Sequence, residues 1–193
     1  MDRRGRLSER LTWIPRTRFS KGPIKPSGTC SRRHWAGHLW SKRAARRIAR
    51  TRGHQSNGVA EPQAAVTDTH AVIFHAAGSG TLGTKAGAFF DRCERREAIL
   101  YVPTVVIWEV SLLARVARIN LRRTVRAFFD DLFSNPAYHP LDVTPEQVYL
   151  ADELRFNRDP FDALICAAAR SLELPLITRD GDIRGSGAVK VIW

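Results

Sequence analysis

Four acidic residues occupy positions that suggest a metal-binding site. They are Asp68, Glu109, Asp162 and Asp180. If they meet in the folded chain, two carboxylates about 4 Å apart repel by roughly 4 kcal/mol at an effective dielectric of about 20. A divalent cation removes this repulsion, and carboxylate ligands favour the hard ions Mg²⁺ and Mn²⁺. Because such an ion activates water and neutralises charge on a phosphodiester, these residue types suggest metal-dependent phosphodiester hydrolysis.

Two of the acids lie where predicted strands end. Asp68 closes a short β-like run at 65–68, and Asp180 follows an apolar run that ends at Thr178. In open parallel sheets, ligands bind beyond the carboxyl ends of the strands. We therefore expect Asp68 and Asp180 to lie at the same edge of a sheet.

The other two acids lie in predicted helices. Glu109 is surrounded by apolar residues, so its carboxylate needs a partner or a metal ion. Asp159 and Asp162 flank the start of another helix, where free N–H groups and the helix dipole favour carboxylates. Asp159 is therefore best interpreted as an N-cap. Asp162 could be a dipole partner, but the apolar run that follows it favours a place in the acidic site.

Short strands alternate with helices around these acids. Strands are predicted at 65–68, 99–102, 140–143, 174–178 and 189–193. Helices are predicted at 70–77, 86–97, about 104–118, 122–133 and 161–172, with another opening at 144–146. Thr104 is the expected N-cap of its helix, and Pro145 and Pro160 suit the first helical position. The alternation indicates an α/β fold with a mainly parallel sheet covered on both faces.

Several short motifs resemble those of VapC-type PIN domains, the toxin half of VapBC toxin–antitoxin pairs. They are Val66-Thr67-Asp68-Thr69-His70, Ile107-Trp108-Glu109-Val110, Arg158-Asp159-Pro160-Phe161-Asp162-Ala163-Leu164-Ile165 with Ala167-Ala168-Ala169, Leu176-Ile177-Thr178-Arg179-Asp180, and Val191-Ile192-Trp193. Each is weakly specific alone, but they follow the family's order across residues 65–193. Two features depart from the family: the Gly-rich loop at 78–85 and the basic residues before Ala64.

The resemblance implies a three-layer α/β/α fold and an endoribonuclease that depends on Mg²⁺ or Mn²⁺. It implies that the metal is held by Asp68, Glu109, Asp162 and Asp180. Thr67 or Thr178 would then orient a ligand or water, and Asp159 would support the ligands from behind. The implied partners are the RNA substrate, a VapB-like antitoxin that covers the acidic site, and a second copy of the chain in a homodimer.

The charge is divided unevenly along the 193 residues, whose formal net charge is +12. Residues 1–65 hold 16 Lys and Arg against 3 Asp and Glu, a net of +13. Residues 66–193 hold 15 against 16, a net of −1. We therefore divide the chain into a basic extension of low order at 1–63 and a nuclease-like domain at 64–193.

The basic extension has three interpretations. It could be a solvated tail, with a short basic helix at 40–52 that would be marginal alone. It could contact RNA or DNA, because Trp13, Trp35 and Trp40 alternate with arginines and could stack on bases. A start codon assigned too far upstream would also produce such a segment.

Two other functions fit parts of the pattern. The chain could be a non-enzymatic nucleic-acid-binding protein that acts through its basic extension. It could also be a different Mg²⁺ phosphohydrolase on a similar sheet. The second alternative is weaker, because Asp68 is followed by Thr69 and His70 and so forms no Asp-x-Asp pair.

Cysteine use and hydropathy point to the cytoplasm. Cys30, Cys93 and Cys166 form an odd set without paired spacing, so neither disulfides nor a zinc site is expected. No apolar run approaches the roughly 18 residues of a membrane helix, and no secretory signal is visible near Met1. We expect a cytoplasmic protein without a membrane partner.

Overall fold

The computed structural model describes residues 12–13, 62–78, 80–154 and 158–193. The basic helix predicted at 40–52, and nearly all of the predicted extension, lie outside these residues. Thr12–Trp13 are described, as a two-residue strand, β1. This strand pairs antiparallel with β4 (Ile119–Asn120), and Trp13 lies opposite Ile119.

Five parallel strands form the central sheet, in the order β5-β3-β2-β6-β7. They are β2 (Ala64–Thr67), β3 (Ile99–Pro103), β5 (Tyr138–Leu141), β6 (Leu176–Ile177) and β7 (Val191–Ile192). The inner strands are apolar because helices cover the sheet on both faces, and Val66 and Leu176 are fully buried. Pro140 lies on the edge strand β5, where a missing N–H is tolerated.

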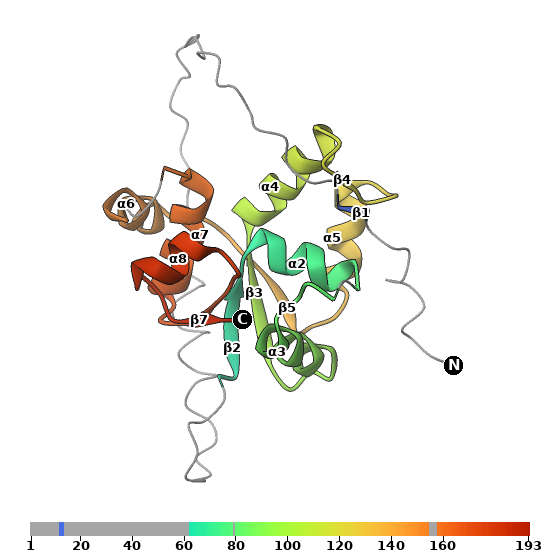
Figure 1. Cartoon of the computed structure of the whole chain (residues 1–193), viewed down its shortest axis with the longest axis horizontal. Coiled ribbons are helices and arrows are strands. Elements are labelled where there is room, and N and C mark those ends of the chain that lie inside the picture. Colours follow the sequence, from blue (N-terminus) through green and yellow to red (C-terminus); the bar gives the residue numbers. More distant parts are fainter. Residues whose placement is uncertain (1–11, 14–61, 79, 155–157) are drawn as a thin grey trace, which may run out of the picture. The chain divides into compact units, whose positions relative to one another are not determined.

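Seven helices are described around the sheet, and Figure 1 shows α2 and α3 on one side of it and α7 and α8 on the other. They are α2 (Thr69–Ala76), α3 (Thr84–Glu94), α4 (Thr104–Arg115), α5 (Val125–Phe133), α6 (Pro145–Glu153), α7 (Pro160–Ser171) and α8 (Gly181–Ser186). The predicted three-layer α/β/α fold is therefore confirmed. Within the described residues, no helix is long and apolar enough to cross a membrane.

Local capping chemistry begins several helices as expected. Thr144 and Gln147 form a reciprocal capping box at α6, and Pro145 takes the first helical position. Pro160 likewise takes the first helical position in α7. The prediction for α4 was wrong: Pro103 is the N-cap and Thr104 is already helical, because the extended backbone of β3 continues through the proline.

Some element boundaries differ from the expected ones, and left-handed residues explain three of these differences. The helices α3 and α4 end before 97 and 118 because Arg96 and Ala117 have φ angles of 63° and 54°. A third such residue, Arg122 at 54°, delays the start of α5 until after its cap, Thr124. Left-handed backbone cannot continue a right-handed helix. The short elements β4 and α8 were not predicted.

Candidate metal centre

The carboxyl ends of β2 and β6 bring two of the predicted acids together. Asp68 follows β2 directly, and its backbone N–H donates to the carbonyl oxygen of Ile177 at 3.0 Å. Thr178, just after β6, donates its hydroxyl to Oδ2 of Asp68 at 2.8 Å. The backbone N–H of Asp180 in turn donates to the Thr178 hydroxyl at 3.0 Å. Thr178 therefore links the two acids, as the parallel strands led us to expect.

Asp68 is the most deeply buried of the four acids, with 2% of its surface exposed. Burial raises the pKa of its carboxyl from 3.8 to about 6, and the charge of Asp180 adds to this rise. The hydrogen bond from Thr178 acts in the opposite direction. A carboxylate held in this way keeps its oxygen atoms fixed while its charge is poorly compensated.

Glu109, on α4, joins the same site through a residue that sequence reasoning missed. The hydroxyl of buried Thr69, at the start of α2, donates to Oε2 of Glu109 at 2.6 Å. Burial raises the pKa of Glu109, and the charges of Asp68 and Asp159 contribute to the rise. Thr69 was missed because its position suggests only the first residue of a helix, and its partner lies 40 residues away.

Asp162 lies in the first turn of α7. Its neighbour one turn later, Cys166, has a pKa raised to about 12 by burial and then by the charges of Asp162, Asp68 and Asp180. The charges of these three acids therefore all reach the Cys166 thiol. The convergence of all four acids on one metal site stays a prediction.

Two acids near the site also cap helices. Oδ1 of Asp159 accepts from the backbone N–H of Phe161 at 2.9 Å, as the N-cap interpretation predicted. Oδ1 of Asp180 accepts from Asp182 and Ile183 at 2.8 and 2.9 Å and so caps α8. Asp180 thus combines a structural contact with a position beside Asp68.

Two further residues near Asp68 differ in what they contribute. The buried hydroxyl of Thr67 donates to the backbone oxygen of Asp68 at 3.0 Å, which orients the main chain rather than a carboxylate. Nδ1 of His70 lies 3.9 Å from Oδ2 of Asp68. His70 was not among the predicted site residues, and its spacing of two residues after Asp68 is the sequence signal that could have placed it at the site.

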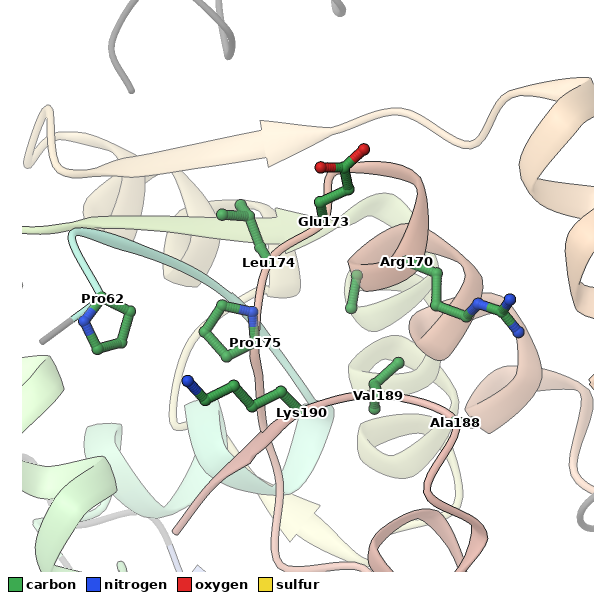
Figure 2. Close-up of a pocket in the computed structure, with 9 residues that line it drawn as sticks. Pro62, Arg170, Glu173, Leu174, Pro175, Ala188, Val189 and Lys190 are labelled. Carbon is green, nitrogen blue, oxygen red and sulfur yellow. The ribbon is translucent and has the colours of Figure 1, made fainter. Parts of the chain in front are cut away.

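The structure also has a surface pocket, and this pocket lies at the opposite end of the sheet (Figure 2). Pro62, Pro175 and Lys190 line it, and they precede β2, β6 and β7. Because the strands are parallel, their amino ends face away from the acids at their carboxyl ends. The pocket is therefore separate from the candidate metal centre.

The donor chemistry of the acidic site suits a hard divalent cation. Its side-chain ligands would all be carboxylate oxygens, and burial and mutual repulsion raise the pKa of both Asp68 and Glu109. Within the described residues, no group of three or more His, Cys, Asp or Glu side chains is arranged to hold a metal ion. By ligand type and charge alone, the acids suit a hard divalent cation.

Fold and site together define a three-layer α/β/α domain with a carboxylate-rich centre at the carboxyl edge of a parallel sheet. Residues 65–186 match the model of the PIN domain family. The chain therefore belongs to the PIN domain family, whose members are nucleases.

Comparison with solved structures finds chains of similar length to the PIN domain. In VapBC2 from Rickettsia felis bound to a promoter DNA fragment, the matched chain is 12% identical, with a TM-score of 0.49 over 66% of this chain and 96% of that one. In a toxin–antitoxin complex from Klebsiella pneumoniae, the matched chain is 19% identical, with a TM-score of 0.47 over 67% of this chain and 96% of that one. In FitAcB from Neisseria gonorrhoeae, the matched chain is 16% identical, with a TM-score of 0.47 over 65% of this chain and 94% of that one. No curated protein has a significant sequence match.

Proposed function

We propose that this chain is an endoribonuclease that depends on Mg²⁺ or Mn²⁺ and cleaves RNA phosphodiester bonds. The observation that carries the proposal is the buried carboxylate of Asp68, which Thr178 fixes beside Asp180 in a PIN domain. A buried carboxylate whose neighbours are further carboxylates favours a cation ligand. A nucleic-acid phosphodiester is the substrate that the family membership supports.

The acids would hold the ion, and the hydroxyl groups would hold the acids. The proposed ligands are Asp68, Glu109, Asp162 and Asp180. When bound, the ion would supply an activated water and neutralise charge on the phosphate. The hydroxyls of Thr178 and Thr69 fix one oxygen each of Asp68 and Glu109, so these carboxylates need little reorganisation.

The biological role that we propose is that of a toxin controlled by a VapB-like antitoxin in the cytoplasm. A basic group of the antitoxin would pair well with clustered carboxylates. The indole of Trp108, next to Glu109 on α4, is 50% exposed, and such a side chain suits a protein partner. The structure from Klebsiella pneumoniae is a toxin–antitoxin complex by its own description. We also propose a homodimer.

The direct test is cleavage of single-stranded RNA by the purified chain with Mg²⁺. We expect activity that Asp68→Asn and Asp180→Asn each reduce by at least about a hundredfold, because each removes charge from the proposed metal ligands. Asp182→Asn is the matched control, since Asp182 is exposed on α8. Cleavage that continues in excess EDTA would rule out the proposed mechanism.

A further inference from the structure

Arg179 is a cation at the edge of the acidic site that does not pair with the acids. It lies between Thr178 and Asp180 in the sequence, and its side chain is exposed. Its Cζ lies 5.0 Å from the centroid of the Phe74 ring. In the part of the chain that the structure describes, Arg179 forms no ion pair with any carboxylate.

The aromatic ring beneath Arg179 is itself fixed. Phe74, on α2, is 4% exposed, and it packs edge-on against Trp193 with ring centroids 6.4 Å apart. The imidazole of His70 lies on the same ring, 6.0 Å away. Because α2 also begins with Thr69, the helix that orients Glu109 also carries the support for the guanidinium.

This arrangement leaves a positive charge available beside a negative centre. A cation–π contact orients a guanidinium but does not neutralise it, and arginine stays charged at every physiological pH. An RNA that brings one phosphate to the carboxylates must also bring the neighbouring phosphates close to negative charge. A fixed, exposed guanidinium offsets that repulsion and can bind a phosphate through two parallel hydrogen bonds.

We propose that Arg179, supported by Phe74, binds an RNA phosphate adjacent to the one that is cut. This inference rests on the proposed ribonuclease function and assigns one contact to the substrate backbone. The contact recognises phosphate and not a base, so it strengthens binding to any RNA sequence.

The test is the binding of a labelled single-stranded RNA oligonucleotide to the full chain in EDTA, measured by fluorescence anisotropy at several salt concentrations. We expect Arg179→Ala to raise Kd about tenfold, the loss typical of one charge-assisted hydrogen bond. The slope of log K against log salt should fall by about 0.7, the value for one phosphate contact on a single strand. The Kd of Arg179→Lys, which keeps the charge but loses the planar fork, should lie between those of the wild type and Arg179→Ala.

Arg184→Ala is the matched control, because Arg184 is exposed on α8 and its loss changes the net charge equally. A Kd or a salt slope for Arg179→Ala equal to that of Arg184→Ala would overturn the assignment while wild-type cleavage still supported the nuclease. If the wild-type chain cleaves no RNA with Mg²⁺, the proposed function itself fails, and the assignment of Arg179 fails with it. RNA oligonucleotides that each carry one uncharged methylphosphonate linkage should be tested in turn. At one linkage position, Arg179→Ala should cause no further loss of affinity.

Discussion

At the scale of single residues, hydroxyl groups hold the acids of this site in place. Thr178 donates to Asp68, and Thr69 donates to Glu109. A hydroxyl orients a carboxylate without neutralising it, so the negative charge stays available for a metal ion. Burial raises the pKa of both acids, and the hydrogen bonds from the two hydroxyl groups offset only part of that rise.

We expect the stability of the metal-free protein to fall as the pH rises from about 4 to about 6. The folded state keeps the Asp68 proton up to a pKa of about 6, whereas the unfolded state loses it near 3.8. The folded state therefore binds more protons in this interval, and linkage makes the loss roughly 3 kcal/mol. Urea unfolding in EDTA at pH 4, 5, 6 and 7 measures it.

Asp68→Asn is the control for that measurement, because the amide does not titrate. The free energy of unfolding of this variant should stay constant through the same pH interval, so that the variant is more stable than the wild type above pH 6. Mg²⁺ at a hundred times its Kd should stabilise the wild type by about 2.7 kcal/mol and the variant much less. Parallel pH curves for the two proteins would contradict the assignment of the shift to Asp68.

A second prediction at this scale concerns Thr69. Its hydrogen bond lowers the pKa of Glu109, so Thr69→Val should raise that pKa further. The acid limb of the pH profile of kcat/KM should then move to higher pH, and Mg²⁺ affinity should fall about 10- to 100-fold. Thr69→Ser keeps the hydroxyl and should leave both close to the wild type. An unchanged profile for Thr69→Val would show that the hydrogen bond does not control Glu109.

At the scale of elements, the sequence predicted what local chemistry determines. Thr144, Pro145 and Pro160 act within one helical turn, so the starts of α6 and α7 were predictable. The neighbouring positions of Asp68 and Asp180 followed from the geometry of parallel strands.

Features that depend on distant packing were not predictable. The bond between Thr69 and Glu109 requires α2 and α4 to meet, and no local pattern predicts that contact. The strand β4 has only two residues, too few for a periodic signal, and its partner β1 is more than 100 residues earlier. The cation–π contact between Arg179 and Phe74 likewise joins residues from separate elements.

A prediction at the element scale concerns the contact between the start of α3 and the end of β7. A Cβ added to Gly83 would lie 2.6 Å from the carbonyl carbon and from Cδ1 of Trp193. Gly83→Ala should therefore displace Trp193 and lower the free energy of unfolding by about 1–3 kcal/mol. The measurement is urea unfolding, repeated in a chain that lacks Trp193, where the loss should shrink.

Gly87→Ala is the matched control for this test. Gly87 lies within the same helix, and an added Cβ would meet only Cδ2 of Leu82, at an ordinary 3.9 Å. Because alanine favours a helix over glycine by about 1 kcal/mol, this variant should be as stable as the wild type or more so. Equal losses for both variants would show that the contact with Trp193 is not the cause.

At the scale of the whole molecule, charge and catalysis belong to different parts of the chain. Residues 1–65 carry a net charge of +13, and all the proposed catalytic acids lie after them. We expect a chain that begins at residue 62 to keep its kcat with Mg²⁺, and its RNA affinity to depend less steeply on salt. Gel-based cleavage and binding titrations at several salt concentrations measure the two effects.

The opposite result would support a different function for this protein. If removal of residues 1–61 abolished every interaction with RNA and the full chain showed no cleavage, a non-enzymatic nucleic-acid-binding protein would be the better description. The truncation also removes β1, so unfolding of the shortened chain must be measured alongside. Only two residues pair with β4, and the expected loss of stability is correspondingly small.

The strand order has a consequence for synthesis. The central strand β2 is bordered by β3 and β6, and Thr178 follows Asp68 by 110 residues. Because synthesis proceeds from the N-terminus, the β2 segment leaves the ribosome long before β6 has been made. Until then Asp68 lacks its hydroxyl partner, Thr178. The ribonuclease that we propose would therefore be inactive in a growing chain that has not yet reached Asp180.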